Sequence, residues 1–140
     1  MALRFGSAAW AEALRDALNA SSEYRNAAAK WGTGFNGNIM LAFEAGDGLS
    51  APLHLFLALA AGRCERAEFV PAPSHPEAGF TLRARYAVWR DVLGRRMLAA
   101  QAILTGKMDV DGDRITLLRH AGANRALIHV TASLDTEFPS

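Results

Sequence analysis

Apolar residues near the start of the chain recur at helical spacing. Trp10, Leu14 and Leu18 lie four residues apart, and Ser7 stands before them as a capping residue, which predicts a first helix. The polar stretch at residues 19–22 interrupts this helix, and Ser22 is expected to cap a second one. The residues expected to face inward on the second helix are Tyr24, Ala27, Ala28 and Trp31.

The middle of the chain alternates apolar and polar positions at the period of two that strands show. This alternation predicts strands over residues 38–44, 53–59, 64–70 and 80–86. A Gly-Asp-Gly turn at residues 46–48 predicts that the first two strands form an antiparallel hairpin. Both faces of residues 53–59 are apolar, so this strand is expected in the centre of the sheet, covered on both sides. Their order along the chain favours a meander of antiparallel strands.

Two short helices are predicted before the last strand. Residues 86–93 carry an apolar stripe that ends at Gly94, and residues 97–104 form a second helix that closes at Gly106. Residues 107–110 then alternate again as a short strand. Together these elements predict an α+β fold with about five strands, mainly antiparallel, and a helical excursion before the last strand.

A further helix is predicted after the last strand. Asp113 is well placed to cap it, because a short acidic side chain accepts hydrogen bonds from the first free amides of a helix. Ile115 and Leu118 are expected on its buried side, and Gly122 just beyond its end.

Length, charge and cysteine content narrow the class of protein. A chain of 140 residues suits one domain over residues 1–140. The formal net charge of +1 lacks the basic excess of a nucleic-acid binder, so no nucleic-acid partner is expected. Cys64 is the only cysteine, which excludes an internal disulfide and a multi-cysteine metal site. A hydrophobic content of 51% indicates a large core, an oligomer interface or a pocket for an apolar ligand.

Targeting signals are not apparent in the sequence. The first residues lack the apolar run of a secretory signal. The longest apolar run, residues 51–61, is far shorter than the ~20 residues that span a bilayer. We therefore expect a soluble, cytoplasmic protein.

The sequence Ile-Leu-Thr-Gly-Lys-Met-Asp-Val-Asp-Gly-Asp at residues 103–113, with an apolar helix after it, resembles the closing segment of the sterol carrier protein-2 family. Residues 80–86 and 89–94 are similar to that family's strand and first helix before this segment, and residues 36–47 to its first strand and turn. The resemblance implies an SCP-2-like fold in which helices cover one side of the sheet and wall a lipid tunnel. It implies an apolar small-molecule ligand (a sterol, fatty acid, acyl thioester or isoprenoid), with no catalytic residue, cofactor or metal.

The expected cavity lies between the sheet and the helices predicted on either side of the last strand. Two short helices joined at Gly94 make a less rigid lid than one long helix, because each is near the length where helices are marginal alone. Gln101, Arg90 or Arg83 is a candidate for head-group selection at the rim. The residues expected to bind the ligand are Leu55, Leu57, Leu82, Trp89, Leu93, Met97, Gln101, Leu104, Met108, Ile115 and Leu118.

Other motifs fit known sites poorly. The G-x-G-x-x-G pattern at residues 32–37 follows a helix and precedes a strand, which is the reverse of a dinucleotide site. The aspartates within residues 109–113 begin like a calcium loop, but the glycine and glutamate that such a loop needs do not follow. Cys64 with His54 or His75 lacks a third catalytic group.

The sequence thus predicts a non-enzymatic carrier that holds an apolar ligand. An alternative stays open, namely an accessory or dimerisation module of a lipid or quinone pathway, in which the same apolar surface contacts a protein or a second copy in a homodimer. A basic cluster around the lid either touches anionic membranes transiently or is an ordinary solvated face. Its members are Arg83, Arg85, Arg90, Arg95 and Arg96.

Overall fold

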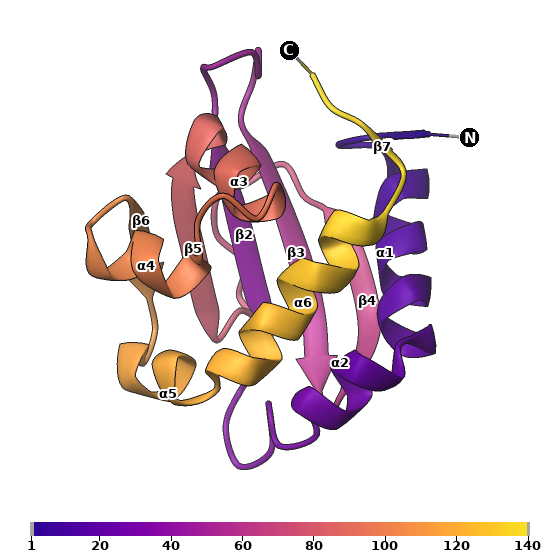
Figure 1. Ribbon diagram of the computed structural model, residues 1–140, viewed down its shortest axis with the longest axis vertical. Coiled ribbons are helices and arrows are strands. Elements are labelled where there is room, and N and C mark those ends of the chain that lie inside the picture. Colours follow the sequence, from indigo (N-terminus) through magenta and orange to yellow (C-terminus); the bar gives the residue numbers. More distant parts are fainter. Residues whose placement is uncertain (1, 140) are drawn as a thin grey trace.

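The computed structural model describes residues 2–139 and places a five-stranded sheet behind a layer of helices (Figure 1). The strand order across this sheet is β4-β3-β2-β5-β6. Its strands are β2 (Ile39–Glu44), β3 (Leu53–Ala60), β4 (Arg63–Phe69), β5 (Phe80–Arg85) and β6 (Met108–Asp111). The helices are α1 (Ala8–Ala20), α2 (Ser22–Ala27), α3 (Tyr86–Leu93), α4 (Ala99–Leu104), α5 (Arg114–Arg119) and α6 (Ala121–Ser133). The short strands β1 (Leu3–Arg4) and β7 (Thr136–Glu137) pair in parallel beside them.

The predicted α+β class, with a mainly antiparallel sheet, is confirmed, but the meander is wrong at one point. β2, β3 and β4 are antiparallel neighbours, as are β5 and β6, whereas β5 lies beside β2 and runs parallel to it. The proline-rich loop after β4 carries the chain back past β3 before β5 begins. The Gly79 and Phe80 amides both donate hydrogen bonds to the Asn38 carbonyl, which aligns the starts of β5 and β2.

The same loop covers the face of the sheet that the helices leave open. His75 stacks on the Phe56 ring of β3, with 3.9 Å between ring centroids. Met40, Phe56 and Ala58 form a small buried cluster there, against which Val70 and Ala78 pack. β3 is therefore an inner strand buried on both faces, as its continuous apolar sequence predicts.

The N-terminal helices follow the prediction with two corrections. Ser7 caps α1 by accepting a hydrogen bond from the Trp10 amide, and the stripe of Trp10, Leu14 and Leu18 is fully buried. The cap of α2 is Ser21, whose hydroxyl accepts a hydrogen bond from the Tyr24 amide, and Ser22 is already helical. Ala27 is exposed, because the helix is six residues long and buries only Tyr24.

The elements around α4 and β6 are confirmed, except that α4 begins at Ala99, two residues later than predicted. α3 ends at Gly94, and α4 closes at Gly106, which adopts a left-handed φ of +78°. Asp113 caps α5, accepting hydrogen bonds from the Ile115 and Thr116 amides.

The region after Asp113 differs from the prediction. Ile115 is exposed, and Leu117 is the fully buried residue of α5. Gly122 does not end a helix but lies in the first turn of α6, a helix of 13 residues that the sequence reading missed. The helical conformation is interrupted two residues earlier, at His120, where φ is −100° and ψ is 40°. In Figure 1, α6 (yellow) crosses the helical side of the sheet diagonally.

Candidate functional site

An apolar pocket of about 360 Å³ lies between the sheet and the helices α3 to α6. Its floor is formed by Leu41 of β2 and Leu82 of β5, which face the helical layer. α3 and α4 supply one wall, and α5 with α6 the other. The lining residues are Glu23, Leu41, Leu82, Trp89, Val92, Arg95, Met97, Leu98, Ala99, Ala100, Ile103, Leu117, Leu118, Ala121, Asn124, Arg125, Leu127, Ile128 and His129.

Trp89 ties the α3 wall to the floor of the pocket. Its indole Nε1 donates a 2.9 Å hydrogen bond to the Ala42 carbonyl of β2, and its ring packs 4.8 Å from that of Phe43. The indole nitrogen therefore has its partner inside the fold and the ring presents apolar surface to the pocket.

The structure brings together four of the residues predicted to bind a ligand. Leu82, Trp89, Met97 and Leu118 line the pocket. The other seven lie elsewhere. Leu55, Leu57 and Met108 are buried in the core, and Leu93 lines a second, smaller pocket. Gln101, Leu104 and Ile115 are exposed.

The position of α6 explains much of this difference. Figure 1 shows it running in front of β3, whose Leu55 and Leu57 are fully covered. α6 also supplies six lining residues that the sequence reading missed: Ala121, Asn124, Arg125, Leu127, Ile128 and His129. A signal for this helix exists, because Ala123, Ala126, Leu127 and Val130 recur at helical spacing and are all buried.

Polar side chains surround the mouth of the pocket. His129 of α6 lies with its Nδ1 2.8 Å from a carboxylate oxygen of Glu23 in α2. Asn124 donates a 2.8 Å hydrogen bond to the Leu117 carbonyl, which joins α6 to α5. The guanidinium groups of Arg95 and Arg125 have no ion pair or hydrogen bond to any of residues 2–139.

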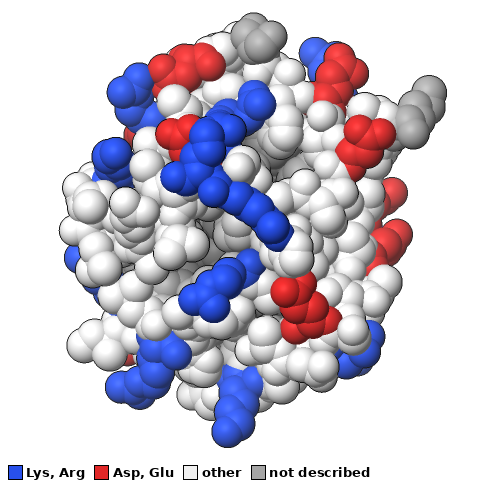
Figure 2. Space-filling view, in the orientation of Figure 1, with Lys and Arg blue, Asp and Glu red and all other residues white. Residues whose placement is uncertain are grey.

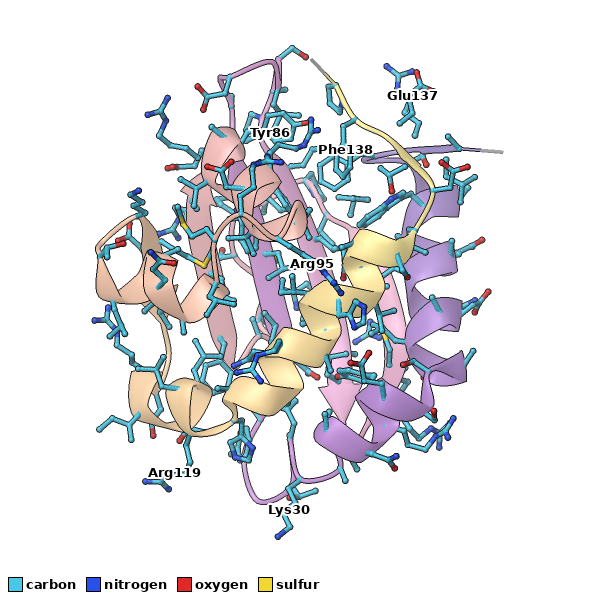
Figure 3. The ribbon with its side chains drawn as sticks, viewed as in Figure 1. Lys30, Tyr86, Arg95, Arg119, Glu137 and Phe138 are labelled. Carbon is cyan, nitrogen blue, oxygen red and sulfur yellow. The ribbon has the colours of Figure 1, made fainter. Side chains whose placement is uncertain are left out.

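Arg95 occupies an unusual position. It adopts a left-handed φ of +61° in the connection between α3 and α4, a conformation uncommon for residues with a side chain. Figure 3 shows its side chain extending over α6. In Figure 2, Lys and Arg side chains run across the middle of this face, with recessed surface between them. The mouth is therefore positively charged while the interior is apolar.

The basic cluster predicted around the lid does not form one charged surface. Arg83 lies 3.6 Å from Asp111, Arg85 lies 2.8 Å from Asp47, and Arg96 lies 3.0 Å from Asp91. Arg90 stacks over the ring of Phe138 near the C-terminus, with its Cζ 4.3 Å from the ring centroid. Of the five, Arg95 alone lines the main pocket.

Candidate reactive groups are not assembled into a site. Cys64 is buried on the helical side of the sheet, and burial raises the pKa of its thiol to about 12. His75 lies over the opposite face, against Phe56. Within residues 2–139 no three His, Cys, Asp or Glu side chains are grouped to hold a metal ion. Nor does any helix in that range have the length and apolar character needed to cross a membrane.

A sheet covered by helices, with an apolar pocket between the two layers, has the features of a small-molecule binding site. Comparison with known proteins defines the family. The sequence model described as the SCP-2 sterol transfer family matches residues 12–123, so the chain belongs to that family. The expected SCP-2-like fold is thereby confirmed.

Solved structures agree with this assignment. The crystal structure of a sterol carrier protein 2 is 28% identical, with a TM-score of 0.80 over 93% of this chain and 98% of that one. A protein from Thermus thermophilus, described as possibly a sterol carrier protein, is 26% identical, with a TM-score of 0.79 over 95% of this chain and 91% of that one.

A more distant likeness concerns the fold alone. A structure named UbiJ-SCP2 ubiquinone synthesis protein is 20% identical, with a TM-score of 0.52 over 89% of this chain and 88% of that one. Among proteins of curated function, none matches the sequence significantly.

Proposed function

We propose that this single domain is a non-enzymatic carrier that holds the acyl chain of an amphiphilic lipid in the pocket beneath α3, α4 and α6. The observation that carries the proposal is an apolar cavity of about 360 Å³ in a chain of the SCP-2 sterol transfer family. Ligand pockets commonly measure about 300–1,000 Å³, so this pocket is near the lower limit and suits a narrow ligand such as an acyl chain. We expect the carrier to act in the cytoplasm.

The size of the pocket allows an estimate of the binding free energy of such a ligand. A methylene takes about the volume of a water molecule, about 30 Å³ in the liquid, so the cavity corresponds to about twelve methylenes. At ~0.8 kcal/mol each, their burial favours binding by about 10 kcal/mol. Association costs at least about 4 kcal/mol, which leaves about 6 or less. Micromolar affinity requires about 8 kcal/mol, so a polar contact at the mouth has to supply the difference.

The mouth of the pocket offers such a contact. Arg95 and Arg125 both line it, and neither side chain is paired within the described part of the chain. Hydrogen bonds from a guanidinium to a carboxylate or phosphate are among the stronger ones in proteins. We therefore propose an anionic head group between these two arginines, in place of the Gln101, Arg90 or Arg83 contacts expected from the sequence.

Native mass spectrometry of the purified protein tests the carrier function. We expect a non-covalent adduct, either as purified or after incubation with dodecanoate, that is released on collisional activation. The matched comparison is Ala99→Trp, which places an indole in the pocket, against Ala29→Trp in the exposed turn after α2. Equal adducts on both variants, or no adduct on the wild type after incubation, would contradict the proposal.

The alternative from the sequence, an accessory or dimerisation module, has weaker support. The fold is shared with the UbiJ-SCP2 ubiquinone synthesis protein, and a likeness at 20% identity concerns fold only. The two functions differ in solution. Mass by size-exclusion chromatography before and after delipidation separates them, because a dimer that takes up no lipid probe fits the accessory role and a monomer that binds the probe fits the carrier.

A further inference from the structure

The connection between α3 and α4 borders two pockets. Arg95 lines the main pocket, whereas Gly94 and Arg96 on either side of it line a second one of about 80 Å³. We call the second one the small pocket. Its other walls come from α3, from the C-terminal end of α6 and from the segment that follows α6. One water molecule takes about 30 Å³ in the liquid, so the small pocket suits a small ion and not an acyl chain.

The small pocket is basic. Two of the residues that line it are arginines, and none is acidic. Asp135 and Glu137 belong to the segment that borders it, but this segment is extended, and Thr136 and Phe138, which alternate with them, face the pocket. Figure 3 shows the Glu137 side chain pointing outward, away from Phe138. The small pocket therefore attracts anions.

Arg90 supplies a positive charge to the small pocket that no carboxylate of residues 2–139 balances. Its Cζ lies 4.3 Å from the centroid of the Phe138 ring, and its Nη1 donates a 3.4 Å hydrogen bond to the Tyr86 hydroxyl. These contacts hold the guanidinium group in place without neutralising it. A side chain that is already ordered loses little freedom when a ligand binds, which favours affinity.

Arg96 is held in the same pocket. Its Nε donates a 3.0 Å hydrogen bond to Asp91, and its Nη2 donates a 3.1 Å hydrogen bond to the Arg90 carbonyl. Its Nη1 has no hydrogen-bond partner within the described part of the chain. This atom lies against Gly94, where a Cβ would be 2.6 Å from it. The glycine therefore leaves room for the second guanidinium group.

The threonine hydroxyls of the small pocket are already engaged. The Thr131 hydroxyl donates a 2.8 Å hydrogen bond to the Leu127 carbonyl. The Thr136 hydroxyl accepts one of 2.8 Å from the Trp10 indole and donates one to the Leu134 carbonyl. The two arginines are therefore the side chains that can donate to a ligand, and guanidinium groups bind the oxygens of phosphate and carboxylate strongly.

We propose that the small pocket binds a small oxyanion of the phosphate class between Arg90 and Arg96. A phosphate group offers several acceptor oxygens and up to about two negative charges, so it can engage both guanidinium groups at once. Free phosphate and the phosphate group of a larger ligand share this chemistry. Because residues 94–96 border both pockets, a bound anion also limits the movement of Arg95 at the main pocket. That consequence rests on the proposed carrier function, whereas the anion site rests on the small pocket alone.

Titration with inorganic phosphate, followed by NMR of the backbone amides, tests the proposal. Chloride keeps the ionic strength constant, so that general screening does not change during the titration. We expect saturable shifts of the amides of Gly94, Arg96 and Thr131, with a dissociation constant in the millimolar range or below. Arg90→Gln should weaken phosphate binding at least tenfold.

Two neighbouring positions on α6 provide a matched pair of variants. Ala132 lines the small pocket, whereas Ser133 is exposed and outside it. Ala132→Glu and Ser133→Glu each add one negative charge at the same end of the helix, so their effects on the helix itself are similar. We expect Ala132→Glu to abolish the phosphate-dependent shifts and Ser133→Glu to retain them, while the melting temperatures show that both variants are folded.

Dodecyl phosphate distinguishes the two sources of the anion. If the small pocket takes the phosphate of a lipid, dodecyl phosphate should displace inorganic phosphate and bind at least tenfold more tightly. If it takes free phosphate, the two should bind together, with the dodecyl chain in the main pocket. Both results support the anion site and assign its occupant.

Three results would overturn the anion site. These are the absence of saturable shifts with phosphate, shifts that chloride alone reproduces, and equal phosphate affinity of the Ala132→Glu and Ser133→Glu variants. Phosphate binding by a protein that takes up no fatty acid would support the anion site while contradicting the carrier function.

Discussion

A few residues make the interior of the pocket apolar and its mouth basic. Trp89 directs its one polar atom to the Ala42 carbonyl, so its ring adds only apolar surface to the wall. Arg95 and Arg125 lie at the mouth without a protein partner in the described range, whereas Arg85 and Arg96 are each paired with an aspartate. Arg95 and Arg125 therefore keep their guanidinium groups available at the mouth, whereas those of Arg85 and Arg96 are already paired with carboxylates.

The mouth arginines should distinguish ligands by head group. Replacing Arg95 and Arg125 together by glutamine should weaken dodecanoate binding about tenfold, because a guanidinium–carboxylate contact is lost. Binding of dodecanol, which carries no charge, should change little. Displacement of a fluorescent probe measures both affinities, with Arg4→Gln and Arg63→Gln as the charge-matched control. Equal weakening for the acid and the alcohol would contradict a head-group contact.

Cys64 gives a residue-scale prediction about pH. Burial raises the pKa of its thiol to about 12, while the pKa of an unfolded thiol is about 8.5. The folded state therefore holds the proton more tightly. This contribution to stability is complete below about pH 8.5 and is lost as the pH rises towards 12. The free energy of unfolding should fall between pH 8 and 9.5, by at most about 1.4 kcal/mol per pH unit, when measured by urea titration. Cys64→Ala should remove this part of the slope, and an unchanged slope would contradict a raised pKa.

At the scale of elements, local patterns in the sequence predicted much of the fold. Alternation over residues 53–59 and the glycines at 94 and 106 are short-range signals, and they predicted β3, α3 and α4 correctly. The parallel pairing of β5 with β2 is not local, because it depends on a loop that returns the chain across the sheet. The site was predicted in part for the same reason. Leu82 and Trp89 belong to elements that were predicted, whereas most of one wall belongs to α6, which was missed because Gly122 was taken as the end of a helix.

The short helices beside the pocket, α4 and α5, should be among the less stable parts of the domain. α4 and α5 have six residues each, which is shorter than helices that are stable alone, so their order depends on packing. Hydrogen exchange by mass spectrometry should therefore be faster in α4 and α5 than in β2 and β3. Added dodecanoate should slow exchange in α4, which borders the pocket, and leave β2 and β3 nearly unchanged. Exchange in α4 that is as slow as in β3, or insensitive to ligand, would contradict a mobile lid.

At the scale of the whole molecule, the contacts between the two ends of the described chain lie on one side. The ends of the described chain meet where β1 pairs with β7, and the Tyr86 hydroxyl donates a 2.8 Å hydrogen bond to the Pro139 carbonyl beside them (Figure 3). Phe5 adds four close aromatic neighbours in the same region: Trp10, Phe43, Phe69 and Phe138. The short helices α4 and α5 lie away from this end (Figure 1). In a carrier, the sheet would maintain the fold while the short helices beside the pocket move to let a ligand enter.

Titration with a fluorescent fatty acid tests this account most directly. The wild type at micromolar concentration should bind the probe saturably with one site per chain, and Ala29→Trp should match it. Ala99→Trp, which fills the pocket from the first residue of α4, should lose at least tenfold in affinity while its melting temperature stays near that of Ala29→Trp. Absence of saturable binding by the wild type, or undiminished binding by a folded Ala99→Trp protein, would contradict a lipid pocket between the sheet and its helices.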